Sequence, residues 1–73
     1  MKTYYYSIDD DQIRSWETVE AKTLRGAKLK VAKIAKEYGI IEARLGYKHG
    51  DFVVVTHRRV DGRWSEYNDY TMI

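Results

Sequence analysis

The chain has 73 residues, of which 44% are hydrophobic and 14% aromatic, with 13 Lys and Arg against 11 Asp and Glu and a formal net charge of +2. This length and apolar content predict a single small domain over residues 1–73 and exclude a disordered chain. The absence of cysteine excludes disulfides and thiolate chemistry. No apolar run is long enough for a signal peptide or a membrane span, so we expect a cytoplasmic protein that does not bind a membrane.

The N-terminal part of the chain predicts two short strands. Within residues 2–8, Tyr4 and Tyr6 fall on one face by alternation, and within residues 15–21 the side chain of Val19 points to the predicted core. We expect these two strands to pair antiparallel, joined by the polar segment between them.

That polar segment contains three consecutive acids, residues 9–11. Adjacent carboxylates suggest a calcium loop, but EF-hand spacing would place Ile13 and Arg14 where an oxygen ligand and a glycine are required. We therefore interpret the segment as a solvated turn and predict no metal site.

The clearest predicted element is an amphipathic helix over residues 23–39. Thr23 is a good N-cap, and Gly39 stands where a left-handed C-cap residue is expected. Gly26, in the first turn, is either a tolerated defect or a place where another backbone comes close. Apolar side chains that recur with the helical period define the predicted core face: Leu24, Ala27, Val31, Ile34, Ala35 and Tyr38.

Three further strands are predicted after the helix, over residues 40–47, 52–59 and 64–67. The Asp61-Gly62 pair before the last strand favours a tight type I′ hairpin. The remaining residues, 68–73, are expected to form a tail. One face of the first of these strands carries Ile41, Ala43, Leu45 and Tyr47.

The order β-β-α-β-β-β predicts an α+β fold, a single domain with a five-stranded antiparallel sheet and one helix packed on one face. Because residues 52–55 are all apolar, both faces of their strand should be partly shielded. Residues 70–73 folded across the back of the sheet, a second copy or a partner would each provide that shield. The residues expected to be buried together are Val19, Leu24, Val31, Ile34, Tyr38, Ala43 and Leu45.

The sequence contains no pattern typical of catalysis. No serine lies in a Gly-x-Ser-x-Gly elbow, no HExxH or similar zinc spacing occurs, and no glycine-rich loop opens a helix. His49 falls in a predicted turn and His57 in a predicted strand, where a histidine is usually inert. We predict a non-enzyme without cofactor or metal.

Positive charge is concentrated on the predicted helix. Six basic side chains and no acidic one occur between residues 22 and 36. Leu29 lies among them, and a leucine ringed by long cations resembles a small interface centre with a charged rim. Lysines that only solvate the outer face of a helix are the plain alternative. The predicted partner-binding residues are Arg25, Lys28, Leu29, Lys33 and Lys36, with a second candidate patch of Arg58, Arg59 and Arg63 near the hairpin.

Short motifs spread over residues 16–65 carry a family resemblance. They are Glu20-Ala21, Leu24 and Ala27-Lys28, followed by two strands and an Asp61-Gly62-Arg63-Trp64 hairpin. This pattern resembles small proteins of phages and other mobile elements, in particular one β-β-α-β-β-β group of type I-F anti-CRISPR inhibitors. The chain departs from that group in its acidic residues 9–11 and its longer tail.

The resemblance implies a non-catalytic inhibitor in the cytoplasm of a host cell. Such proteins bind subunits of a CRISPR–Cas effector, the Cascade surveillance complex, and sterically block its access to target DNA. Some also promote non-specific duplex DNA binding by the complex. The matching positions here are Lys28 and the hairpin residues. There are two alternatives to this function. One is a small nucleic-acid-binding accessory protein that uses a basic helix face, and the other is a structural or self-associating domain. The chain is expected to be a monomer or a homodimer.

Overall fold

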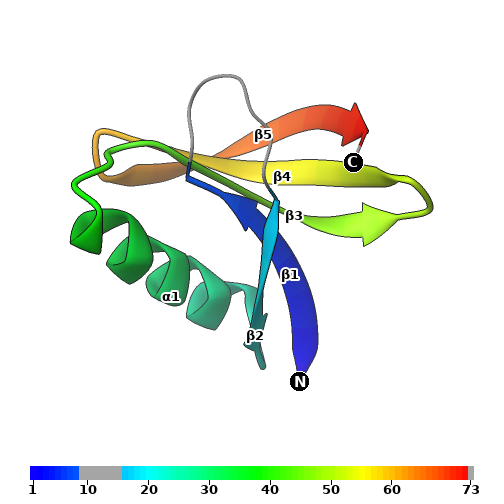
Figure 1. Ribbon diagram of the computed structural model, residues 1–73, viewed down its shortest axis with the longest axis horizontal. Helices are drawn as coiled ribbons and strands as arrows, with labels where there is room; N and C mark the ends of the chain where they lie inside the picture. Colours follow the sequence, from blue (N-terminus) through cyan, green and yellow to red (C-terminus); the bar gives the residue numbers. More distant parts are fainter. Residues whose placement is uncertain (9–15, 73) are drawn as a thin grey trace.

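The computed structural model describes residues 1–8 and 16–72. Within them the chain forms β1 (Lys2–Ser7), β2 (Glu17–Ala21), α1 (Leu24–Glu37), β3 (Ala43–His49), β4 (Phe52–Val60) and β5 (Arg63–Met72). All neighbouring strands are antiparallel, in the spatial order β2-β1-β3-β4-β5, and α1 lies on one side of the sheet (Figure 1). This confirms the predicted α+β fold. The predicted acidic turn at residues 9–11 lies outside the described residues.

The ends of α1 are fixed by the caps that the sequence predicts. The backbone N–H of Gly26 donates to Thr23 Oγ1 at 3.1 Å, which satisfies one of the free amides of the first turn. At the other end Gly39 has φ +70°, and its N–H donates to the carbonyl of Lys36. The N–H of Ile40 reaches back to the carbonyl of Ala35 at 2.9 Å. These paired bonds form a Schellman motif, in which glycine is favoured.

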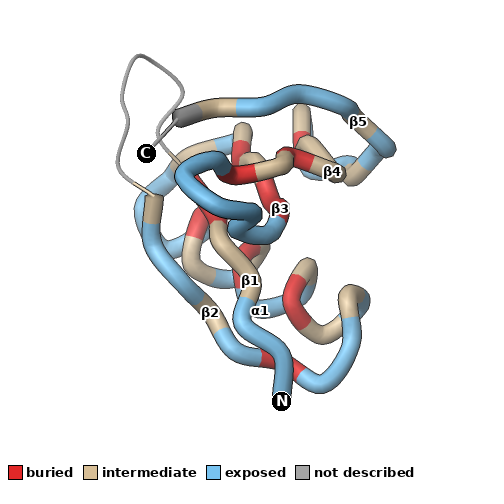
Figure 2. The backbone as a smooth tube through the Cα atoms, turned by 90° about the vertical axis from the view of Figure 1, so that its right-hand side faces the viewer, coloured by how far each residue is buried: buried red, intermediate tan, exposed pale blue. Residues whose placement is uncertain are grey.

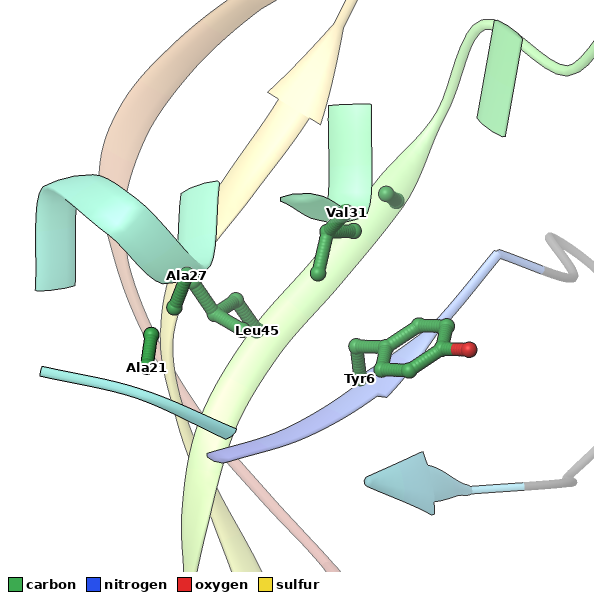
Figure 3. Close-up of a cluster of buried hydrophobic side chains, with 6 residues drawn as sticks. Tyr6, Ala21, Ala27, Val31 and Leu45 are labelled. Atoms are coloured by element: carbon green, nitrogen blue, oxygen red, sulfur yellow. The ribbon is translucent and has the colours of Figure 1, made fainter. Parts of the chain in front are cut away.

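The hydrophobic core lies between α1 and the inner strands. Helix residues Ala27 and Val31 pack there with sheet residues from β1, β2 and β3, and the side chains converge in Figure 3. The core cluster consists of Tyr6, Ala21, Ala27, Val31, Ala43 and Leu45, with Tyr4, Ile8, Val19, Leu24, Ile34 and Trp64 partly buried against it. Of the residues predicted to be buried together, three are buried, three are partly buried against them, and one lies outside the core.

Tyr38 is the exception, because 69% of its surface is exposed. The prediction extended the helical period of 100° per residue to this position. In the structure α1 ends at Glu37, and Tyr38 is the C-cap with φ −96° and ψ 2°. Its side chain therefore leaves the face that the wheel assigned to it.

The strand predicted over residues 40–47 is displaced by three residues and begins at Ala43. The backbone N–H of Ile40 is engaged in the C-terminal cap of α1. Ile41, which precedes the strand, is 59% exposed. Gly46 is buried where the backbone of β4 comes very close. A Cβ there would stand 2.0 Å from the Val54 carbonyl oxygen, so no larger residue fits without moving β4.

The C-terminal residues form part of the sheet, which corrects the prediction of a short last strand followed by a tail. Beyond the Asp61-Gly62 turn, whose φ values of 53° and 81° match the predicted type I′ hairpin, β5 pairs with β4 as far as Phe52 opposite Met72. The tail therefore does not cross the back of the sheet. The place of Ile73 lies outside the described residues.

The apolar residues 52–55 of β4 led us to expect that both faces of this strand are partly shielded. On one face the side chains of these residues are fully buried. Val53 and Val55 are completely buried although neither belongs to the cluster beneath α1. Val54 points to the other face and is half-buried. Figure 2 shows buried positions gathered in the inner strands and on one side of α1, with the edge strands β2 and β5 mostly exposed.

Candidate functional site

The outer side of α1 carries a stripe of exposed side chains that we call the basic helix face, Arg25, Leu29, Lys33 and Lys36. Spacings of four, four and three residues bring them to one side of the helix. This side lies opposite the buried positions Ala27, Val31 and Ala35. Leu29 is 66% exposed, so an apolar group lies in the open between long cationic side chains.

The charges of the basic helix face are not neutralised within the described part of the chain. The salt bridge seen among the described residues joins Arg58 to Glu42 at 3.6 Å, and neither residue belongs to α1. Lys30, by contrast, is engaged, because its ammonium donates to the carbonyl oxygen of Glu20 in β2. The unpaired cations leave this side of α1 electrostatically open to a partner.

Lys28 lies at the edge of this surface and turns toward the sheet. It is half-buried, and its positive charge acts on His57 of β4. Burial of the imidazole, followed by the charge of Lys28, lowers the pKa of His57, while Glu66 opposes the shift. Lys28 therefore differs from the exposed residues of the basic helix face in being half-buried and in acting on a residue of the sheet.

The second predicted patch, Arg58, Arg59 and Arg63, is not one surface. Side chains alternate along β4, so Arg58 and Arg59 lie on opposite faces of the sheet. Arg58 lies on the face away from α1, 3.6 Å from Glu42 and 5.5 Å from the ring centre of Tyr67. Arg59 faces α1 and is 94% buried, whereas Arg63 is exposed beside the turn. Strand alternation would have revealed this split in the sequence.

An exposed aromatic surface at the far end of the sheet was not predicted. Tyr47 and Tyr70 flank Val54 in register, so the three side chains share one face of β3, β4 and β5. Tyr70 is 70% exposed, and Phe52 also has a large exposed surface. We call Tyr47, Phe52, Val54 and Tyr70 the distal aromatic face. The alternation of residues 45–47 places Tyr47 on the same face as Leu45, and nothing in the sequence shows that this end of β3 is exposed.

Groups suited to catalysis or metal binding are sparse in the described residues. There, no cluster of three or more His, Asp or Glu side chains could hold a metal ion. His57 Nδ1 lies 2.9 Å from the hydroxyl of Thr56, which itself donates to the carbonyl of Leu45. No helix in the described ranges has the length and apolar character needed to cross a bilayer.

Comparison of the chain with protein-family models, curated proteins and solved structures finds no match.

Proposed function

We propose that this chain is a non-catalytic binding domain that docks through its basic helix face on a larger complex. We further propose, on the family resemblance, that the complex is a host CRISPR–Cas surveillance complex whose access to target DNA the bound domain blocks. The observation that carries the docking surface is the exposed leucine, Leu29, set among cations that form no salt bridge within the described residues.

The chemistry of this surface favours a protein contact. A small apolar centre that loses water on binding, with a charged rim, is the usual anatomy of a protein interface. Its positive charge requires acidic residues on the partner, which would steer association and fix the orientation. The domain cannot act as a charge mimic of DNA, because DNA is acidic and this face is basic. Inhibition would therefore occur by steric occlusion.

The size of the domain constrains how it binds. A standard interface buries about 800 Å² on each partner, which is about a sixth of the 5039 Å² surface of the described chain. The outer side of α1 is about 21 Å long and one helix wide. A stable contact must therefore extend past α1, and half-buried Lys28 is the predicted cation at its edge.

The test is a double charge reversal, Lys33→Glu with Lys36→Glu, assayed by calorimetry against a purified surveillance complex. Both side chains are exposed and form no salt bridge within the described residues, so stability should change by less than about 0.5 kcal/mol for each. Affinity should fall at least about tenfold, or about 1.4 kcal/mol.

The matched control reverses Lys2 and Lys48, which are exposed on β1 and β3 and change the net charge equally. The control should bind as the parent chain does. If the folded Lys33 and Lys36 double variant keeps its affinity, the basic helix face is not the docking surface and the site must be sought on the sheet or hairpin.

A second candidate function is binding of nucleic acid, and the distal aromatic face is the observation that favours it. Exposed rings such as Tyr47 and Tyr70 can stack on unpaired bases. Cations are needed nearby for the phosphates, and the basic helix face would supply them from another side of the domain.

A further inference from the structure

Arg59 is the one buried cation among the described residues. Only 6% of its surface is exposed, and its Nε, fully enclosed, has no hydrogen-bond acceptor. An arginine side chain cannot lose its proton at any ordinary pH, so the charge stays in place. A buried polar atom without a partner is destabilising, and most such groups are satisfied by protein, water or an ion.

The position of Arg59 follows from the register of three strands. It lies opposite Ala43 of β3 and Trp64 of β5, on the side of the sheet that faces α1. The helix makes its main contacts with β2 and β3, so this part of the face lies beside α1 rather than beneath it. The guanidinium extends toward the β4–β5 turn, where Nη2 is 3.8 Å from the place a Cβ on Gly62 would take. Since Gly62 has no side chain, residue 62 itself places none over that end of Arg59.

The neighbours of Arg59 on this face are also basic. His57 is two residues back on the same face of β4, about 7 Å away along the strand. The ammonium of Lys28, from α1, acts on the His57 ring. Glu66 of β5, opposite His57, is the acid that faces this group, and it forms no salt bridge in the described structure. Two permanent cations and an imidazole thus face one carboxylate.

We propose that Arg59, with His57 and Lys28 beside it, forms a binding site for a phosphate group at the β4–β5 hairpin. The guanidinium would contact the phosphate through its Nη atoms at the turn, in the two-point geometry that arginine offers to phosphate oxygens. A phosphate, with a charge of about −1.5 to −2, balances two cations better than a carboxylate does. This site shares Lys28 with the edge of the proposed docking surface, but Arg59 and His57 lie on β4, outside the basic helix face.

Nuclear magnetic resonance on the whole chain tests the site directly. Inorganic phosphate is titrated against chloride at constant ionic strength, with the Arg59 Nε–H and the His57 ring as reporters. We expect a saturable shift of the Arg59 signal and a rise in the pKa of His57, because a nearby anion favours the protonated imidazole. Acetate, which supplies a carboxylate, should shift neither reporter appreciably.

Two variants at the same hairpin separate the site from general charge. Arg59→Met should weaken phosphate binding at least about tenfold, as followed by His57, while Arg63→Met, an equal charge change at an exposed position, should alter it less than about twofold. Should Arg59→Met fail to fold, the titration of the parent chain still decides. A nucleoside monophosphate and a short oligonucleotide without terminal phosphate then show whether the site takes a phosphomonoester or a diester.

Three results would overturn the proposal. The first is a parent chain in which phosphate moves neither reporter. The second is an equal response of the reporters to acetate, which would mean that the site binds carboxylates as well as phosphate. The third is an equal loss in Arg63→Met, which would reduce the effect to nonspecific attraction. Binding of the surveillance complex is expected to survive Arg59→Met, and phosphate binding to survive reversal of Lys33 and Lys36, so the two proposals fail separately.

Discussion

Gly26 lies in the first turn of α1 with room around its missing side chain. A Cβ there would stand 3.5 Å from Ala21 Cβ and from Thr23 Oγ1, which are ordinary contacts. No described backbone comes close, so within the chain the glycine is a tolerated defect. We predict that Gly26→Ala raises the free energy of unfolding by about 0.5–1 kcal/mol, since alanine restricts the unfolded chain and favours the helix. Urea unfolding measures the change.

The control is the same substitution at Gly39. Its φ of +70° is strained for alanine, so Gly39→Ala should lower stability by about 1 kcal/mol. A destabilising Gly26→Ala would show that the space beside the first turn is needed and that the defect interpretation is wrong.

His57 gives stability a dependence on pH whose sign is fixed by its surroundings. Burial and the charge of Lys28 lower the pKa of His57 below 6.5, while Glu66 opposes them and Thr56 hydrogen-bonds the ring. The unfolded chain therefore takes up the proton first as pH falls. We predict that the stability contributed by His57 is complete above pH 6.5 and is lost as pH falls below it.

The measurement is the free energy of unfolding between about pH 8 and about pH 5 in the parent chain and in His57→Gln. In His57→Gln the free energy of unfolding should fall less steeply as pH falls. His49→Gln, at an exposed position at the end of β3, is the control and should leave the curve unchanged. Parallel curves for the parent and His57→Gln would contradict the prediction.

At the scale of elements, β5 is an integral edge strand. Residues 70–72 pair with Val54, Val53 and Phe52, and Val53 is completely buried. We predict that deleting residues 70–73 lowers the free energy of unfolding by about 2 kcal/mol or more, because these pairs and the cover beside Val53 are lost. Thermal melting would measure the loss.

Tyr70→Thr provides the matched control, because it removes an exposed ring and keeps the backbone pairing. Its effect should stay within about 0.5 kcal/mol. An unchanged melting temperature after the deletion would mean that the pairing of residues 70–72 adds nothing to stability.

The elements differ in how far the sequence could predict them. For α1, the caps at Thr23 and Gly39 and the apolar period act locally and agree, so the helix was predicted to within two residues. The start of β3 and the end of β5 depend on pairing between distant residues. The shift of register near Gly46 and Val55 changes which residues meet. Period-two alternation cannot show such a shift, because one extra residue reverses the faces.

At the scale of the whole molecule, a candidate surface could be predicted from the sequence when all of its residues belong to one helix or strand. Arg25, Leu29 and Lys33 share a side of α1 because of helical geometry alone. The burial of Arg59 and the exposure of the distal aromatic face both depend on what lies across the sheet, which the sequence does not show. The domain thus presents a basic surface on α1 and an uncharged aromatic surface at the end of the sheet.

The salt dependence of binding distinguishes a protein partner from nucleic acid. If Arg25, Lys28, Lys33 and Lys36 neutralised phosphates of duplex DNA, log K would fall with log salt at a slope of about −3 to −4, from a factor of about 0.9 for each phosphate. An interface centred on Leu29 retains its apolar term as ions screen the rim, so its slope should be shallower. We predict the shallow slope for the surveillance complex and the steep one for free duplex DNA. Calorimetry over a salt series with each ligand gives both slopes. Equal, steep slopes would mean that the basic helix face contacts nucleic acid in both cases, and the protein-docking proposal would then have to be abandoned.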